Sequence, residues 1–200
     1  MSPPFLVRPA RSEDADAIAG VHHQGWRETY PGLMPQAVLD GMTLERRVQL
    51  WRRIIHEEPP GGARFVAEMS VGATAGKVES RFPPGVATAQ RIVGVAQCGP
   101  AREAELNARW EVWMLYVLRA AQQMGVGSAL MRAMVDHLAK QDDGGAEADR
   151  SLGLWVLKGN DRAIRFYRRQ GAALTGVAKR EERAGGVVDD VAMRWPDLPR

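Results

Sequence analysis

The chain has 200 residues, of which 45% are hydrophobic and 26% are charged, and its formal net charge is +3. This length and apolar content can build one compact core, so we expect a single domain over residues 1–200. The small positive excess is spread over the whole sequence and forms no dense lysine and arginine stripe, which excludes a dedicated nucleic-acid binder.

Cysteine and histidine usage narrows the chemistry further. Cys98 is the single cysteine, which excludes an internal disulfide and suits a reducing cytosol. It lies inside the apolar run Ile92–Cys98, so we interpret it as a buried core thiol rather than a nucleophile. The four histidines lack the carboxylate or cysteine spacing of zinc sites, so we expect no metal. Because no span of ~20 apolar residues occurs, we expect no membrane partner and a cytoplasmic protein.

The first sixty residues predict one strand followed by helices. Phe5–Pro9 is expected to form the strand. Ser12 is the expected N-cap of a helix that continues to about Tyr30, where a Pro-Gly pair ends it. A short helical segment is expected at Pro35–Leu39. Thr43 is expected to cap the next helix, which carries an apolar stripe at spacings of three and four.

Two β-prone segments and a long connection follow. Arg64–Ala67 and Ile92–Cys98 are the expected second and third strands. Between them, residues 70–91 are rich in Gly, Ala, Ser, Thr and Pro and show little periodicity, which predicts a long hairpin loop. We interpret this loop as a surface insertion rather than a functional lid.

The second half of the chain alternates strand and helix patterns. The apolar runs 112–118 and 152–157 predict strands, and residues 128–140 predict a helix between them. Val187–Arg194 alternates weakly and predicts a last strand. The predicted fold class is α/β, with a mixed α+β arrangement in which helices lie on both faces of one sheet.

A loop with two glycines, Gln122–Gly127, joins the strand at 112–118 to the helix that follows. The backbone N–H groups of such a loop and of the first helical turn point toward one anion. Glycine at 125 and 127 would let the backbone approach that anion, because a Cβ would hold it away. The segment therefore predicts either a diphosphate site or only a tight turn.

Two common nucleotide-binding patterns fit this loop poorly. In the dinucleotide fingerprint G-x-G-x-x-G counted from Gly125, the third glycine is replaced by Leu130, and no acidic residue follows at the end of a second strand. The Walker pattern fails because no Gly-Lys-Ser/Thr occurs in the sequence. A nucleotide-binding oxidoreductase built on Gly125 and Gly127 stays as an alternative interpretation.

The loop instead fits the pattern Q/R-x-x-G-x-G/A through Gln122, Gly125 and Gly127. A second signature, N-x-x-A-x-x-F-Y, runs from Asn160 to Tyr167. With the flanking strands in the same order, these blocks resemble the GCN5-related N-acetyltransferases, and the likeness extends over nearly the whole chain. The other segments that carry it are Val7–Ala10, Trp26–Gly32, Trp110–Leu118 and Leu152–Leu157.

This resemblance implies a mostly antiparallel sheet that splays open between its fourth and fifth strands. It also implies acetyl-CoA as co-substrate, with the diphosphate on the loop and the pantetheine arm along the fourth strand. A backbone N–H of Tyr116 or Val117 would then donate to the thioester oxygen. The residues assigned to the coenzyme are Leu115, Tyr116, Val117, Gln122, Gln123, Met124, Gly125, Val126, Gly127, Ser128, Asn160 and Tyr167.

The resemblance further implies catalytic roles. Tyr167 is the expected general acid, because a phenol with a reference pKa near 10 can protonate a leaving thiolate whose reference pKa is about 8.5. Glu111 is the expected general base, acting through a water molecule, and Glu28 is the second candidate. Each of these side chains can also be read as ordinary core or solvent-facing structure. The candidates for the acceptor pocket are Trp26, Glu28, Tyr30 and Trp113.

One departure from the family pattern concerns charge. Gln123 and Met124 stand where Gly-Arg or Gly-Lys is frequent, so we expect Arg119, Arg132 or Lys158 to supply the positive charge for the phosphates. The resulting interpretation is an acetyl-CoA-dependent N-acetyltransferase that modifies a primary amine of a small molecule or peptide by direct attack in a ternary complex. The alternative within this fold is a non-catalytic coenzyme A-binding sensor. The resemblance also suggests a homodimer.

Overall fold

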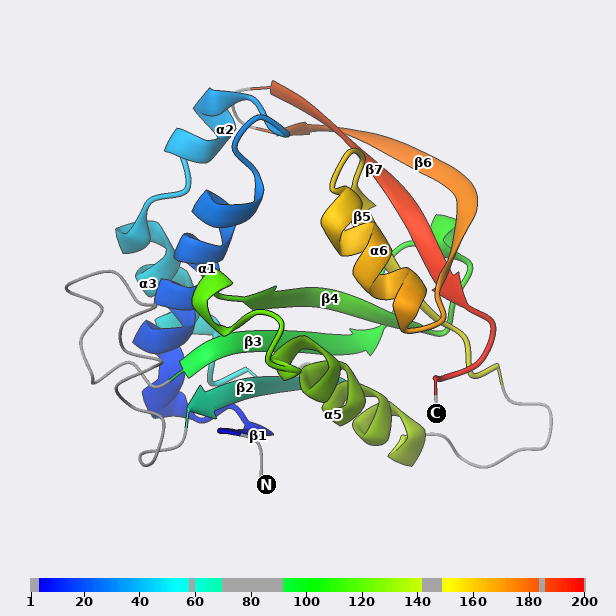
Figure 1. Ribbon diagram of the computed structural model, residues 1–200, viewed down its shortest axis with the longest axis horizontal. Helices are drawn as coiled ribbons and strands as arrows, with labels where there is room; N and C mark the ends of the chain where they lie inside the picture. Colours follow the sequence, from blue (N-terminus) through cyan, green and yellow to red (C-terminus); the bar gives the residue numbers. More distant parts are fainter. Residues whose placement is uncertain (1–3, 58–59, 70–91, 142–148, 184–185, 200) are drawn as a thin grey trace.

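The computed structural model (Figure 1) contains one seven-stranded sheet with helices on both faces, which confirms the predicted mixed α/β class. The strands are β1 (Phe5–Pro9), β2 (Ala63–Met69), β3 (Ile92–Pro100), β4 (Trp110–Val117), β5 (Leu152–Leu157), β6 (Ala173–Arg183) and β7 (Gly186–Trp195). The longer helices are α1 (Ala15–Thr29), α2 (Gln36–Asp40), α3 (Leu44–Ile54), α5 (Val126–Lys140) and α6 (Asp161–Arg169). The residues that the structure describes are 4–57, 60–69, 92–141, 149–183 and 186–199.

The strand order is β1-β2-β3-β4-β5-β7-β6, and every neighbouring pair is antiparallel except β4 and β5. Helices α1 and α3 pack against one face of the sheet through Ile18, Val21 and Trp51. Helix α5 packs against the other face through Leu130 and Met134, and the two layers are visible in Figure 1. The predicted hairpin loop at 70–91 lies outside the described residues.

The predicted strands and helices of the first half are confirmed in place, but the start of the first helix differs. Ser12 was expected to cap it, whereas Ser12–Asp14 forms a short 3₁₀ turn and α1 begins at Ala15. Asp14 organises this turn, because its buried carboxylate accepts from the backbone N–H of Arg11 at 2.8 Å and pairs with Arg8 at 2.7 Å. The longer side chain reaches partners on β1 that a serine hydroxyl cannot reach.

The predicted helix cap at Thr43 is confirmed, and a second side-chain cap occurs at Asn160. The Thr43 hydroxyl accepts from the backbone N–H of Arg46 at 3.3 Å at the start of α3. The Asn160 side-chain oxygen accepts from the backbone N–H of Ala163 at 3.2 Å at the start of α6. Both contacts satisfy N–H groups that the first helical turn leaves without a partner.

Strand β6 was not predicted. Its second half, residues 179–183, consists entirely of charged residues, which are unfavourable in most strands. The strand lies at the edge of the sheet and pairs only with β7 among the described strands, and most of its side chains are exposed. Charged side chains protect such an edge from pairing with another chain, so tertiary position overrides local preference here.

The predicted splay between β4 and β5 is confirmed by the pairing register. Within the described strands, the two pair in parallel only at Trp110 with Leu152 and at Glu111 with Gly153. Beyond Glu111 the strands diverge, and Figure 1 shows them running apart. From Val112 onward, the backbone groups on that side of β4 therefore have no partner among the strands that the structure describes.

A β-bulge distorts β4 just where the divergence begins. The register with β3 steps from Cys98 opposite Val112 to Gln97 opposite Met114, so Trp113 is the extra residue. Such a bulge re-aims the side chains that follow it. Val112 accordingly packs with the α5 layer, whereas Met114 and Tyr116 pack with α1 and α3.

Candidate active site

A cavity of about 1120 Å³ opens where β4 and β5 separate. Its walls come from β4, β5, the loop before α5, the length of α6, the second half of α1, the second half of α3 and the β6–β7 pair. Of the residues singled out from the sequence, those that line it are Trp26, Tyr30, Glu111, Trp113, Leu115, Tyr116, Val117, Gln122, Gln123, Gly125, Gly127, Ser128, Asn160 and Tyr167. Three of the coenzyme, catalytic and acceptor candidates, Glu28, Met124 and Val126, are not among its lining residues.

The two glycines of the loop are required for different reasons. Gly125 is the N-cap of α5 with φ +87°, a conformation that side chains other than glycine rarely adopt, and a Cβ there would meet nothing within 4 Å. At Gly127 a Cβ would lie 3.3 Å from the ring of Phe166. The sequence suggested that both glycines leave room for a close ligand. The structure adds a second reason at each position: the backbone conformation at Gly125 and the packing against Phe166 at Gly127.

The N-terminus of α5 opens toward this cavity. Among the described residues no side chain caps it, and Gly125, Gly127 and Ser128 line the cavity wall. The N–H groups of a first helical turn have no partner within the helix, and the helix dipole adds partial positive charge there. The arrangement is that of an anion-binding helix terminus.

Gln122 fixes the loop to the end of β4. Its side-chain Nε2 donates to the carbonyl oxygen of Val117 at 2.8 Å. The next residue, Gln123, has φ +64°, and Met124 packs against the core next to α5. The glutamine of the first signature therefore acts on the protein's own backbone, a role that the sequence pattern alone did not indicate.

The backbone of β4 has a defined orientation at the cavity. The N–H of Leu118 donates to the carbonyl of Val93 on β3 at 2.9 Å. Because successive residues of a strand point their N–H and C=O groups to opposite edges, Tyr116 also faces β3, whereas Val117 and Leu115 face the gap toward β5. The carbonyl of Val117 accepts from Gln122 on that side. Of the two predicted oxyanion donors, this geometry favours Val117.

Tyr167 is buried in the wall formed by α6. Its exposed fraction is 7%, and its ring makes edge contacts with Phe166 and Trp195. Burial, with a smaller contribution from Tyr30, raises the pKa of Tyr167 well above the ordinary phenol value. The hydroxyl therefore keeps its proton at neutral pH.

Glu111 is also buried, at 1% exposure, and it is paired with Arg102. The guanidinium donates at 2.6 Å to one carboxylate oxygen and at 3.1 Å to the other, which also accepts from the backbone N–H of Arg102 at 3.0 Å. The same guanidinium lies 5.2 Å from the ring centre of Trp113. The pair places the Glu111 carboxylate against the Arg102 guanidinium at the point where the strands diverge.

An aromatic cluster forms the end of the cavity next to α1. The hydroxyls of Tyr30 and Tyr116 lie 3.1 Å apart, and the ring of Trp26 meets that of Tyr30 edge-on at 5.0 Å. His22 stacks on Tyr116 with 5.2 Å between ring centres, and its Nδ1 accepts from Trp51 Nε1 at 3.1 Å. Burial lowers the pKa of His22 to about 3, with smaller contributions from Arg47 and His23, so the imidazole is neutral.

Glu28 occupies a different position from the one expected. It lines a neighbouring cavity of about 200 Å³. Its carboxylate accepts from the backbone N–H of Arg119 at 2.7 Å and from Gln24 Nε2 at 3.0 Å, and Arg119 Nη2 donates to the Glu28 carbonyl at 2.7 Å. These contacts tie α1 to the turn after β4, which favours a structural role over that of a base.

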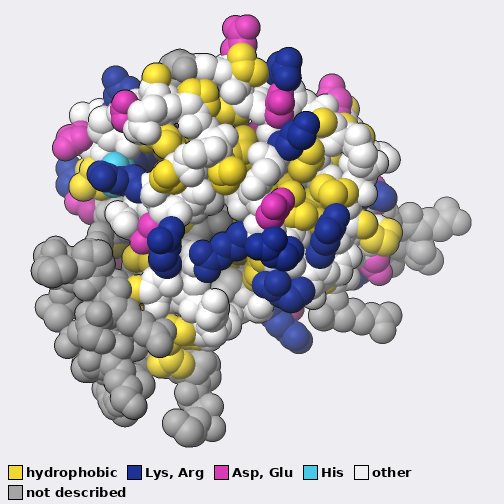
Figure 2. All heavy atoms as spheres, turned by 45° about the horizontal axis from the view of Figure 1, so that its top comes forward, with side chains coloured by type: hydrophobic (Ala, Val, Ile, Leu, Met, Phe, Trp, Pro, Cys, Tyr) yellow, Lys and Arg dark blue, Asp and Glu magenta, His cyan; other side chains and the backbone are white. Residues whose placement is uncertain are grey.

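The positive charge at the cavity comes from residues that the sequence reasoning missed. Arg162, Arg165 and Arg169 line it from α6, whereas the expected Arg119, Arg132 and Lys158 are not among the lining residues. Spacings of three and four residues put the three arginines on one face of the helix, a signal that was available in the sequence. Figure 2 shows a row of basic side chains across the middle of the molecule, in the region of α6.

Other chemistries find little support in the described part of the chain. Burial raises the pKa of the Cys98 thiol to about 12, which makes it a poor nucleophile. Among the described residues no group of three His, Cys, Asp or Glu side chains is placed to hold a metal ion. None of the described helices has both the length and the apolar composition that a membrane crossing requires.

Comparison with known proteins gives a consistent picture. Residues 44–172 match the sequence model of the Acetyltransferase (GNAT) family. The chain is 27% identical over 197 residues to the uncharacterized N-acetyltransferase YuaI of Bacillus subtilis, covering 96% of this chain and 93% of that protein.

Solved structures show the same fold at low identity. An N-acetyltransferase from Staphylococcus aureus Mu50 aligns with a TM-score of 0.62 at 16% identity, covering 97% of this chain and 98% of that one. The PaiA N-acetyltransferase of Thermoplasma acidophilum, solved in complex with coenzyme A, aligns with a TM-score of 0.60, also at 16% identity and with the same coverage.

Proposed function

The chain belongs to the acetyltransferase (GNAT) family, and from that premise we propose that it transfers the acetyl group of acetyl-CoA to a primary amine by direct attack in a ternary complex. The observation that carries this proposal is the cavity between the diverging strands β4 and β5, which meets the uncapped N-terminus of α5. The first provides a strand edge for an amide-bearing arm, and the second provides an anion site.

The residues present fit the coenzyme. The pantetheine arm is peptide-like. The side of β4 facing β5 offers the backbone groups of Leu115 and the N–H of Val117, which have no partner among the described strands there, whereas the Val117 carbonyl accepts from Gln122. The diphosphate fits the first turn of α5 at Gly125–Ser128. Arg162, Arg165 and Arg169 replace the basic pair that the loop lacks, because they bring three positive charges to the same cavity.

Acetyl transfer requires a polarised thioester carbonyl and a proton for the departing sulfur. The N–H of Val117 is our candidate donor to the carbonyl oxygen. Tyr167 is our candidate acid: as the amine nitrogen bonds to the carbonyl carbon and the carbon–sulfur bond breaks, its hydroxyl protonates the sulfur and then regains a proton from solvent. The products are one amide and one free thiol.

The amine must also lose a proton. Glu111 is our candidate acceptor of it, through a water molecule, because it is the buried carboxylate at the divergence point and lies in the cavity wall, paired with Arg102. Both of its oxygens already accept from Arg102, so a water molecule rather than the amine itself is the expected partner. No acyl-enzyme is needed, and the buried Cys98 is not suited to form one.

Two alternative functions make different predictions. A coenzyme A-binding sensor of the same fold would bind both acetyl-CoA and CoA without releasing thiol in the presence of any amine. A nucleotide-binding oxidoreductase would respond to NAD. Family membership favours the acetyltransferase.

A thermal-shift titration with acetyl-CoA, CoA and NAD in parallel tests the donor site. At a hundredfold excess over Kd a ligand adds about 2.7 kcal/mol to the free energy of unfolding, which corresponds to a Tm rise of roughly 5–10 °C for a chain of this size. We expect both CoA species to raise the Tm and NAD to leave it unchanged. Absence of any response to the CoA species would contradict the proposal. If both CoA species bind, thiol release with a panel of amines separates an enzyme from a sensor.

A further inference from the structure

The charges that line the cavity are segregated by element. The charged lining residues of helix α6 are Arg162, Arg165 and Arg169, and all three are positive. The remaining wall carries four carboxylates and two cations, a net charge of −2 among the described lining residues. These six residues are Glu103, Glu111, Glu181, Asp190, Arg102 and Lys179.

We call these six residues the acidic wall. One of its two cations, Lys179, is held by its carboxylates. Lys179 Nζ is bonded to both carboxylate oxygens of Glu103 at 2.6 and 2.8 Å and to Glu181 at 2.7 Å. It also lies 4.5 Å from the ring centre of Trp155. Burial works against its charge, but the hydrogen bonds to Glu103 and Glu181 raise the pKa of Lys179, so it stays an ammonium. Carboxylates and an aromatic face are the chemistry that recognises organic cations.

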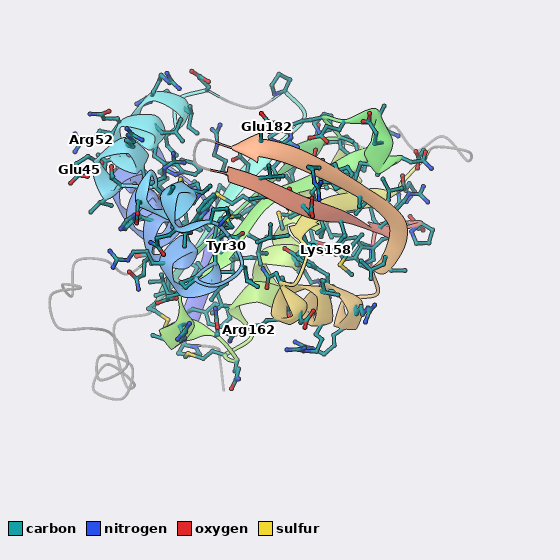
Figure 3. All side chains as sticks on the ribbon, turned by 90° about the horizontal axis from the view of Figure 1, so that it is seen from above. Tyr30, Glu45, Arg52, Lys158, Arg162 and Glu182 are labelled. Atoms are coloured by element: carbon teal, nitrogen blue, oxygen red, sulfur yellow. The ribbon has the colours of Figure 1, made fainter. Side chains whose placement is uncertain are left out.

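The acidic wall and the basic helix lie on different sides of the cavity. Asp190 on β7 is directly opposite Lys179 on β6 in the strand register, and its side chain is buried. In the view of Figure 3, Tyr30 lies between Glu182, near the end of β6, and Arg162, at the start of α6. The coenzyme phosphates therefore belong at the α6 side, and the acceptor meets the side with net negative charge.

We propose that the acceptor is a diamine-type molecule, with a second positive charge at a distance from the nitrogen that is acetylated. This inference rests on the proposed function. The reacting nitrogen must be neutral when it attacks, so the negative wall is useful for a charge elsewhere in the molecule. A wall with a net charge of one sign attracts ligands of the opposite sign and repels those of the same sign, which disfavours acceptors whose far end is a free carboxylate.

Three amines that differ only at the far end test this inference: 1,5-diaminopentane, pentylamine and 5-aminopentanoate. We expect kcat/KM, measured by thiol release with the full chain, to be at least about tenfold higher for the diamine than for pentylamine, and lowest for the amino acid. Raising the salt concentration from about 0.05 M to about 0.5 M should reduce the difference in kcat/KM between the diamine and pentylamine, because salt screens the electrostatic attraction between the acidic wall and the distant ammonium group.

The outcomes separate the two proposals. Equal kcat/KM for the diamine and pentylamine would overturn the diamine inference and leave the acetyltransferase function intact. Turnover of no amine, with acetyl-CoA binding retained, would overturn the proposed function and this inference with it.

Charge variants give a second, independent test. Lys179→Met changes the net charge of the wall to −3 and should raise the ratio of diamine to pentylamine activity by about threefold to fivefold. The double variant Glu103→Gln with Lys179→Met restores −2 and should return the ratio to its original value. Arg180→Met is the matched control, because Arg180 pairs with Asp189 outside the cavity lining. An unchanged ratio in a folded Lys179→Met protein would contradict the inference.

Discussion

Arg102 bonds both carboxylate oxygens of Glu111 at 2.6 and 3.1 Å and adds its own backbone N–H at 3.0 Å. The carboxylate is almost fully buried, whereas more than half of the Arg102 side chain is exposed. Removing the arginine therefore leaves a buried charge without its partner, which costs more than the pair itself contributes.

Arg102→Met is expected to lower the free energy of unfolding by about 2–3 kcal/mol, below the cost for a fully buried pair because water can reach the vacated site. Urea denaturation measures the change. Arg180→Met, which breaks an exposed pair, should stay within about 0.5 kcal/mol of the unsubstituted protein. Equal effects of the two substitutions would show that burial of Glu111 adds nothing to the pair.

Tyr167→Phe should lower kcat by about a hundredfold or more, because the departing sulfur loses its proton donor. The Kd for acetyl-CoA should change little, since the ring and its packing remain. Steady-state kinetics and a binding titration on the same preparation separate the two effects. A variant that turns over at the original rate would remove Tyr167 from the mechanism.

Arg162→Ala combined with Arg165→Ala should weaken acetyl-CoA binding by about threefold to tenfold at low salt, and the loss should shrink as salt screens the phosphates. The matched control is Arg168→Ala, which alters the same helix at a position outside the cavity lining. Calorimetric titration at two salt concentrations provides the comparison. If Arg168→Ala weakened binding as much, the effect would belong to overall charge rather than to the cavity.

His22 should make the protein less stable in mild acid. Its pKa is about 3 in the folded state and about 6.5 in the unfolded chain, so the unfolded state binds the extra proton first. Stability is complete above pH 6.5 and is lost as the pH falls from there toward 3, with a slope from this group approaching 1.4 kcal/mol per pH unit.

Unfolding free energies measured at several pH values test this prediction. His22→Gln, which keeps an acceptor for Trp51, should remove most of the slope. His56→Gln, at an exposed position just after α3, should leave it unchanged. An identical slope in the His22 variant would show that other groups cause the acid sensitivity.

Local patterns were enough to predict the parts of the fold that depend on neighbouring residues. The cap at Thr43 and the glycine loop before α5 are short-range features, because each depends on residues within one helical turn. The divergence of β4 and β5 was predicted only from the family resemblance. No periodicity in either strand indicates where their pairing ends.

The parts that could not be predicted depend on contacts between distant segments. Arg102 meets Glu111 across the turn between two strands, and Arg119 meets Glu28 across 91 positions of sequence. The charged end of β6 becomes a strand because β7 offers an edge, not because its residues prefer that conformation. The arginine face of α6 is the exception, because the spacing of Arg162, Arg165 and Arg169 was present in the sequence although no prediction was made from it.

The brief pairing of β4 with β5 has a mechanical consequence. Within the described strands the two halves of the sheet are joined by two residue pairs at one end, at Trp110 and Glu111, while the rest of the wedge has no backbone ladder. The two strands therefore resist separation near the paired residues Trp110 and Glu111, and resist it very little at the end where they are unpaired. A ligand that hydrogen-bonds to β4 and fills the gap between β4 and β5 connects the two halves of the sheet. Occupancy of the cavity should therefore reduce the motion of the two halves relative to each other.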